Sequence, residues 1–137
     1  MKVSKVQYRV IYGDIDAMGI TYYGNYFRWF EIGRTEFLRE LGLCYRDVER
    51  WGFILPVTET FCKYISPAYY DTVVTIETKL AWLKKASLRF DYKILGQEDG
   101  LELANGYTIH ACLDRDRKVV RIPSFLLDRL EGVKVLS

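Results

Sequence analysis

Apolar and polar positions alternate near the start of the chain. Val6, Tyr8 and Val10 recur at every second position, which is the pattern of a strand with one buried face. We expect this strand to end near Tyr12. The next stretch, GDIDAMGITYYG, holds three glycines and two aspartates, residues that favour turns and unusual backbone angles. Residues 13–24 are therefore predicted to form a loop.

From position 25 the spacing of the apolar residues changes to three and four. The stripe consists of Tyr26, Phe30, Gly33, Phe37 and Leu41. This spacing predicts one helix of about four to five turns, given 3.6 residues per turn. Gly42 is placed to end it. Because glycine inside a helix costs about 1 kcal/mol relative to alanine, we expect Gly33 to mark a close approach of the helix backbone to the sheet.

The second half of the chain is rich in β-branched and aromatic residues and predicts five more strands. They cover residues 53–66, 71–83, 87–95, 101–114 and 118–123, and short helices are expected at residues 45–52 and 123–132. One long helix between a first strand and a run of strands does not give the βαβ alternation of a parallel sheet. We expect a single α+β domain over residues 1–137, with an antiparallel sheet packed on one long helix.

Composition adds an expectation about assembly. The chain contains 11 tyrosines, whose apolar rings with polar tips suit sheet surfaces and interfaces. A one-layer sheet with one helix leaves apolar surface uncovered, so we predict a homodimer or homotetramer. Lys plus Arg number 20 against 18 for Asp plus Glu, a net charge of +2 spread along the chain. This balance disfavours nucleic acid as the main partner.

Cysteine usage and hydropathy predict the compartment. Cys44, Cys62 and Cys112 form no CxxC pair, and an odd number argues against a disulfide framework. The N-terminal residues MKVSKVQYRV lack the apolar centre of a signal peptide. No apolar run reaches the roughly 18 residues that a membrane span needs. We expect reduced thiols, no membrane span and a cytoplasmic protein.

Common catalytic motifs are missing from the sequence. No serine lies in a G-x-S-x-G segment, and no glycine-rich phosphate loop is found. The one histidine, His110, lacks the partners of a metal site. We expect no metal and no cofactor. His110 has the same parity as Thr108 and Cys112 in a predicted strand, so a structural role is favoured over a catalytic one.

Two carboxylates, Asp14 and Asp16, lie in the loop before the long helix. As an isolated pair they are explained more readily by a role as turn formers that accept main-chain hydrogen bonds. The helix start near Tyr23, Gly24 and Asn25 exposes main-chain N–H groups and the positive end of the helix dipole, which polarise a carbonyl oxygen. A carboxylate beside it can act as a nucleophile or as a general base on water. The residues alone leave both interpretations open.

The segment YGDIDAMGITYYGNYFRWFEIGRTEF resembles the motif of the 4-hydroxybenzoyl-CoA thioesterase family, which includes the Tol-Pal cluster type. The similarity continues through PVTETFCKYISPAYYDTVVTIET, the turn LKKAS and GYTIHACLDRDRKVVRIP, so it covers nearly the whole chain. It implies a hotdog fold, in which an antiparallel sheet wraps around one long helix. It also implies hydrolysis of an acyl-CoA thioester to a free acid and CoA, where CoA is part of the substrate.

The resemblance also assigns roles to residues before and within the helix. The second aspartate of the family's D-x-D-x-x-G segment is the catalytic carboxylate, and it falls on Asp16. The family's residue just before the helix falls on Tyr23, whose main-chain N–H, next to Gly24, is implied to hold the thioester oxygen. Asn25 matches as a residue that orders the helix start. Glu31 matches as a pocket or water-positioning carboxylate, with a salt-bridge role on the helix surface equally open.

A basic turn completes the implied substrate site. Lys84, Lys85 and Ser87 match a turn that contacts CoA phosphates in the family, and a solvated strand end is the alternative. Two rival functions stay open, a non-catalytic acyl-thioester binding or scaffold protein and a thioesterase acting on acyl carrier protein. The acyl group is not defined, because the aromatic residues near the helix either line a pocket or fill the core. These residues are Tyr22, Tyr26, Trp29, Phe30, Trp51 and Phe53.

Overall fold

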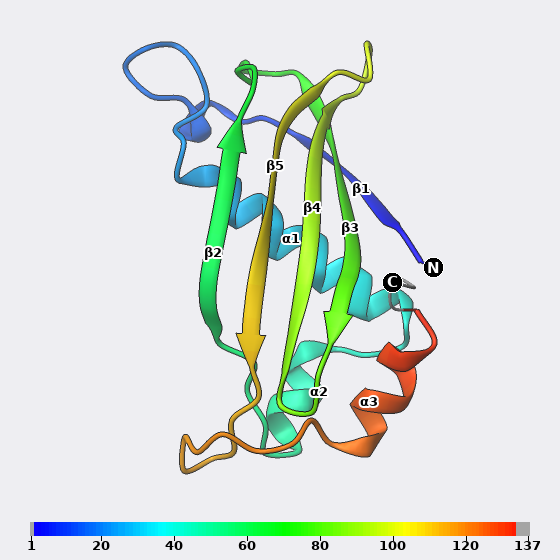
Figure 1. Ribbon diagram of the computed structural model, residues 1–137. Coiled ribbons are helices and arrows are strands. Elements are labelled where there is room, and N and C mark those ends of the chain that lie inside the picture. The colour runs from blue at the N-terminus through cyan, green and yellow to red at the C-terminus, as the bar shows by residue number, and fades with distance from the viewer. Residues whose placement is uncertain (1, 134–137) are drawn as a thin grey trace.

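The computed structural model describes residues 2–133, in which one long helix lies against an antiparallel sheet (Figure 1). The strands are β1 (Ser4–Arg9), β2 (Val57–Tyr64), β3 (Val73–Leu83), β4 (Ser87–Gly96) and β5 (Glu102–Ala111). The helices are α1 (Asn25–Glu40), α2 (Tyr45–Arg50) and α3 (Ser124–Glu131). The strands run in the order β1-β3-β4-β5-β2, each antiparallel to its neighbours. The predicted α+β architecture is confirmed.

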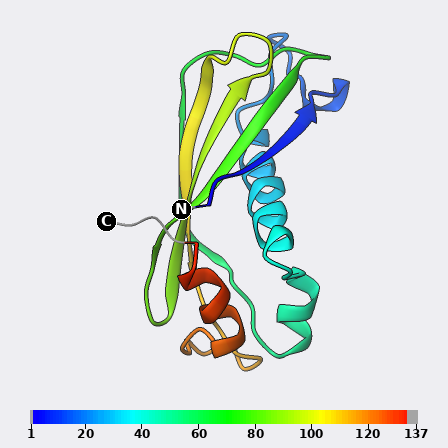
Figure 2. The same cartoon turned by 90° about the vertical axis from the view of Figure 1, so that its right-hand side faces the viewer.

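Helix α1 runs along one face of the sheet and buries its apolar stripe there (Figure 2). Tyr26, Phe30 and Phe37 are at most 3% exposed. At Gly33 an added Cβ would lie 2.9 Å from Cγ2 of Ile76 and would also clash with the Thr78 hydroxyl on β3. The close approach predicted at Gly33 is confirmed. The core lies between this helix face and the inward side chains of β3, β4 and β5.

The strand predicted at residues 118–123 is wrong. In this segment Val119 forms only an isolated bridge with Leu113, and Val120 donates a hydrogen bond to the carbonyl of Cys112. Two residues later Ile122 donates to the carbonyl of Lys85 instead. The segment therefore passes from the end of β5 to the β3–β4 turn, and no ladder forms.

The first strand is shorter than predicted. β1 ends at Arg9, because Tyr12–Asp14 forms a single turn of 3₁₀ helix. The predicted helices near residues 45–52 and 123–132 are confirmed as α2 and α3, and Gly52 follows α2 with a φ of 98°. The ring of Trp51 lies 4.3 Å from that of Phe125, which ties the end of α2 to α3.

Two further observations concern the cysteines and the helices. Cys44 and Cys62 are half-buried free thiols, and Cys112 is a buried one. Within residues 2–133, no helix has both the length and the apolar character to cross a bilayer.

Candidate active site

Asp14 fastens the loop between β1 and α1. Its side chain is fully buried, and Oδ2 accepts hydrogen bonds from the Tyr8 hydroxyl at 2.7 Å and the Ile11 N–H at 3.0 Å. Its main-chain carbonyl accepts from the Tyr22 N–H at 2.8 Å and from the Asn25 side chain at 2.9 Å. Both ends of the loop are therefore held through Asp14.

The charge of Asp14 is balanced by one guanidinium group. Nη1 of Arg28 lies 3.7 Å from Oδ1 of Asp14, an oxygen that accepts no hydrogen bond from residues 2–133. A buried carboxylate is tolerated only when it is paired or hydrogen-bonded. Burial and the hydrogen bond to Asp14 raise the pKa of Tyr8, so its hydroxyl stays a donor. Asp14 has no oxygen facing an open surface and is suited to structure.

Asp16 is placed differently from Asp14. It is half-buried, and Oδ1 accepts one hydrogen bond from the Met18 N–H at 2.8 Å. Gly19, at a φ of 80°, closes the turn by donating to the Asp16 carbonyl at 3.0 Å. No group among the described residues donates to Oδ2 of Asp16. One carboxylate oxygen is thus held by the loop, and the other is available for chemistry.

The Asp16 carboxylate borders an open groove of about 560 Å³ with mostly apolar walls. The groove is lined by Asp16, Ala17, Met18, Ile20, Thr21, Tyr22, Tyr23, Tyr26, Tyr64, Ile65, Ser66 and Pro67. Apolar walls exclude water and strengthen electrostatic interactions inside a site.

The start of α1 offers two main-chain donors beside this groove. Asn25 donates its N–H to the Tyr22 carbonyl at 2.9 Å, and Tyr26 donates to the Tyr23 carbonyl at 3.4 Å. The N–H groups of Tyr23 and Gly24 have no acceptor among the described residues, and no side chain caps the helix. The sequence predicted exposed main-chain donors near Tyr23, Gly24 and Asn25. Because the Asn25 N–H is already bonded to the Tyr22 carbonyl, only the N–H groups of Tyr23 and Gly24 fit that prediction.

Tyrosine rings surround these donors. The rings of Tyr22 and Tyr23 lie 4.6 Å apart, and those of Tyr26 and Tyr64 lie 5.0 Å apart. The Tyr64 hydroxyl donates to the Tyr23 carbonyl at 2.8 Å. An added Cβ at Gly24 would lie 2.8 Å from the Tyr22 ring. Glycine at position 24 therefore lets the Tyr22 ring cover the helix start.

Sequence reasoning missed Tyr64 as a site residue. It lies 41 positions after its partner Tyr23, at the end of β2. No local pattern signals a contact at this separation, since only the strand register brings the two residues together. Among the aromatic residues with two open interpretations, Tyr22 lines the groove, Tyr26 is a core residue that also borders it, and Trp29 and Phe30 are core residues.

The remaining predicted site residues lie elsewhere in the chain. Glu31 is exposed and borders a separate cavity of about 110 Å³, which His110 also lines. Lys84, Lys85 and Ser87 form the β3–β4 turn, closed by a 2.8 Å hydrogen bond from the Lys84 N–H to the Ser87 carbonyl. This turn lies at the opposite end of the sheet from the loop that carries Asp16 (Figure 1). Strand β3, which runs toward the turn, has 11 residues and is about 36 Å long at 3.3 Å per residue.

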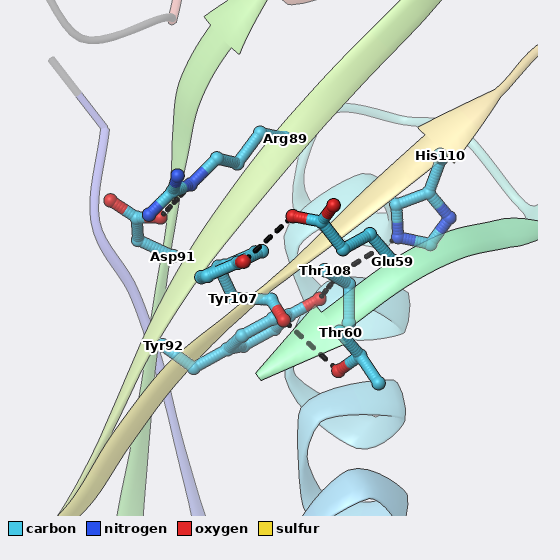
Figure 3. A network of polar contacts seen from close by, with 8 residues as sticks. All are labelled: Glu59, Thr60, Arg89, Asp91, Tyr92, Tyr107, Thr108 and His110. Atoms are coloured by element: carbon cyan, nitrogen blue, oxygen red, sulfur yellow. Dashed lines mark hydrogen bonds and ion pairs between the residues drawn. The ribbon is translucent and has the colours of Figure 1, made fainter. Parts of the chain in front are cut away.

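His110 is a satisfied interior residue, as the sequence favoured. Nδ1 lies 2.9 Å from the Leu55 carbonyl. Nε2 lies 2.8 Å from the Thr108 hydroxyl (Figure 3). Burial lowers the pKa of His110 to about 4, with a smaller effect from the charge of Arg34. A carbonyl only accepts, so Nδ1 carries the proton and Thr108 donates to Nε2. Tyr92 then donates to Thr108 at 2.6 Å, which completes a buried chain.

A second polar network lies among outward side chains of the sheet. The Tyr107 hydroxyl donates to Glu59 at 2.7 Å, and the Arg89 guanidinium lies 4.0 Å from the Tyr107 ring (Figure 3). Arg89 is also paired with Asp91 at 2.7 Å.

In residues 2–133, no three His, Cys, Asp or Glu side chains come together as a metal site would require.

Comparisons with known proteins show which family and fold the chain resembles. A family model described as the thioesterase-like superfamily matches residues 10–130. The putative acyl-CoA thioesterase YneP of Bacillus subtilis is 31% identical over 116 residues, 85% of this chain and 83% of its own. The acyl-CoA thioester hydrolase YbgC of Escherichia coli O157:H7 is 32% identical over 108 residues, 77% of this chain and 78% of its own.

Solved structures show the same fold. The structure of DHNA-CoA thioesterase from Staphylococcus aureus superposes with a TM-score of 0.89 at 30% identity. The superposition covers 96% of this chain and 89% of that one. The antiparallel sheet and single long helix are thus the hotdog arrangement implied by the sequence.

Proposed function

We propose that this chain, a member of the thioesterase-like superfamily, hydrolyses acyl-CoA thioesters and that Asp16 is the carboxylate that carries the reaction. One observation carries the proposal. Asp16, whose Oδ2 accepts no hydrogen bond from the described residues, borders the apolar groove that Tyr23 also lines, at a helix start where the N–H groups of Tyr23 and Gly24 have no acceptor among those residues. Asp14, whose oxygens are buried in the loop, is not a competitor for this role.

The proposed chemistry places the thioester carbonyl at the start of α1. The N–H groups of Tyr23 and Gly24, aided by the helix dipole, stabilise the negative charge that develops on its oxygen. Asp16 then attacks the carbonyl carbon and forms a mixed anhydride that water opens, or takes a proton from the water that attacks. Either route expels the CoA thiolate and yields a free acid and CoA.

We propose that the enzyme works as a homodimer or larger homo-oligomer joined along β2. This strand is at the edge of the sheet and nearly all of its residues are exposed. Val57, Phe61 and Tyr64 on it are 42 to 47% exposed. An exposed edge with apolar side chains is a template for pairing with another strand, and pairing with the same strand of a second copy gives a closed twofold assembly.

Antiparallel pairing of β2 with its copy would bring the Asp16 groove of one chain close to the Lys84–Ser87 turn of the other. Within one chain, the Tyr64 end of β2 lies at the Asp16 groove. The Val57 end pairs with His110, and the next residue, Ala111, pairs with Ser87 of the Lys84–Ser87 turn. A twofold axis across β2 places the Tyr64 end of one copy against the Val57 end of the other. Each groove would then receive its substrate-binding lysines, and the cavity at Glu31, from the second copy.

A mixing experiment tests this divided site. Asp16→Asn and the Lys84→Ala/Lys85→Ala double variant are unfolded together, refolded and assayed for thiol release at low acyl-CoA concentration. Half of the dimers are mixed and each carries one intact site of two, so about a quarter of wild-type activity is expected. Activity no higher than the mean of the separate variants would contradict a site shared between copies.

Two rival functions are separated by the choice of substrate. A binding or scaffold protein retains acyl-CoA without releasing thiol. A thioesterase for acyl carrier protein uses Lys84 and Lys85 against an acidic protein surface in place of nucleotide phosphates. Thiol release from a panel of acyl-CoAs and acyl carrier protein thioesters, measured in parallel, distinguishes these from the proposed function.

A cytoplasmic location also stays a prediction.

A further inference from the structure

Tyr64 joins strand β2 to the main chain at the start of helix α1 by a hydrogen bond. It is the last residue of β2, and its hydroxyl donates to the carbonyl oxygen of Tyr23 at 2.8 Å. Its ring packs edge-on against Tyr26, with centroids 5.0 Å apart. A carbonyl only accepts, so the phenol must donate. Burial raises the pKa of Tyr64, which keeps the donating proton in place.

The carbonyl that Tyr64 holds belongs to the peptide unit that carries one of the two free donors. The Tyr23 C=O and the Gly24 N–H share one planar trans peptide, as the described residues contain no cis bond. In such a unit the two groups point in opposite directions. Fixing the direction of the Tyr23 carbonyl therefore fixes the direction of the Gly24 N–H, outward from the N-terminal end of α1.

The helix alone holds this peptide weakly. Among the described residues, the only N–H of α1 that donates to the Tyr23 carbonyl is that of Tyr26, at 3.4 Å, beyond the usual range of such bonds. The preceding peptide is better held, since the Tyr22 carbonyl accepts from the Asn25 N–H at 2.9 Å. A hydrogen bond to a carbonyl also polarises its peptide and strengthens the N–H as a donor. The Tyr64 hydroxyl therefore both orients and polarises the Tyr23–Gly24 peptide, which the helix itself holds by one long hydrogen bond.

We propose that Tyr64 is a positioning residue for thioester hydrolysis, which orients and polarises the Tyr23–Gly24 peptide so that the Gly24 N–H binds the developing oxyanion. This inference rests on the proposed function of the groove. Tyr64 itself touches no reacting atom in this account. Its hydroxyl acts through the peptide, and its ring forms part of the groove wall.

The variant that isolates the hydroxyl is Tyr64→Phe, because it retains the ring and its contacts. Loss of a direct oxyanion donor lowers kcat by a hundredfold or more, so loss of an orienting bond should lower kcat by about tenfold. KM should change by less than about twofold, because the bond matters most in the transition state. The matched control is Tyr107→Phe, which loses the phenol hydrogen bond to Glu59 among the outward side chains. The control should retain wild-type kcat.

A spectroscopic measurement separates positioning from a structural effect. In the inert Asp16→Asn background, the carbonyl stretch of a bound, isotope-labelled acyl-CoA reports polarisation by the donors. Adding Tyr64→Phe should shift this stretch to higher wavenumber, and adding Tyr107→Phe should not. An unchanged kcat in Tyr64→Phe, a loss confined to KM, or an unshifted stretch would overturn the inference. Activity retained by Asp16→Asn would instead refute the proposed function, so the two failures are distinguishable.

Discussion

The side chain of Asn25 donates a hydrogen bond to the main-chain carbonyl of Asp14 at 2.9 Å. This bond joins the first residue of α1 to the loop, two positions before Asp16. The Tyr22 N–H donates to the same carbonyl at 2.8 Å. The distance between the Asp16 carboxylate and the donors at the helix start therefore depends on one shared acceptor.

Asn25→Ala should lower kcat/KM by about tenfold or more, because misplacement of a catalytic group by 1 Å costs up to about a hundredfold. The free energy of unfolding should fall by only about 1 kcal/mol, the value of one hydrogen bond. Steady-state thiol release and urea unfolding measure the two effects. The control is Asn105→Ala, which loses a 3.1 Å side-chain hydrogen bond to Glu102 outside the groove. Equal activity in Asn25→Ala and Asn105→Ala would show that the hydrogen bond between Asn25 and Asp14 does not position the site.

Gly33→Ala should destabilise the protein although alanine favours helices. The added Cβ would press on Ile76 and Thr78 of β3, and overpacking of this kind costs about 1 to 3 kcal/mol. Gly132→Ala is the control, because its nearest neighbour to an added Cβ lies 3.9 Å away. Thermal unfolding of both variants tests this. A Gly33→Ala variant as stable as the wild type would show that the helix can move off the sheet.

Local patterns in the sequence were sufficient where the structure depends on local chemistry. The stripe from Tyr26 to Leu41 predicted helix α1, and Gly33 within it marked a close approach to the sheet. The glycines and aspartates of residues 13–24 placed Asp16 in a loop before the helix, and the resemblance assigned it the catalytic role, which stays a prediction. The sequence did not distinguish the burial of Asp14 from the openness of Asp16, because that difference comes from contacts with Tyr8 on β1.

Contacts between distant segments were beyond local patterns. Tyr64 reaches Tyr23 only through the pairing of β2 with β5 and the packing of α1. The segment at residues 118–123 has a strand-like composition, yet its main chain donates first to Cys112, just after β5, and then to Lys85. Composition reports whether a segment suits a sheet, and the availability of a partner decides whether a strand forms.

The buried His110 should make stability depend on pH. Its pKa is lowered to about 4 in the folded protein from 6.5, so between these values the unfolded chain binds the proton and the folded chain does not. Stability is therefore lost as pH falls from about 6.5 to about 4, by about 3 kcal/mol at most. Urea unfolding of the wild type and His110→Gln at pH 7 and pH 4.5 measures this. The wild type should lose about 2 to 3 kcal/mol more than the variant, and parallel losses would refute the assignment.

The Lys84–Ser87 turn should matter only for substrates with nucleotide phosphates. Lys84→Ala/Lys85→Ala is expected to raise KM for acyl-CoA about tenfold, and rising salt should shrink this difference because it screens the charges. KM for the matching pantetheine thioester, which lacks those phosphates, should not change. Lys93→Ala, which loses an ion pair with Glu102, serves as the control. If the double substitution changed KM equally for acyl-CoA and for the pantetheine thioester, the result would favour a solvated turn over a phosphate site.

The most direct test of the account is the rate of thiol release from acyl-CoA by Asp16→Asn. We predict that kcat/KM falls by about three orders of magnitude or more while folding and oligomer size stay as in the wild type, since the variant removes only the reacting carboxylate. Asp14→Asn, measured beside it, should lose stability and much less activity, because Asp14 holds the loop through Tyr8 and Ile11. An Asp16→Asn enzyme within tenfold of the wild type would contradict the central claim.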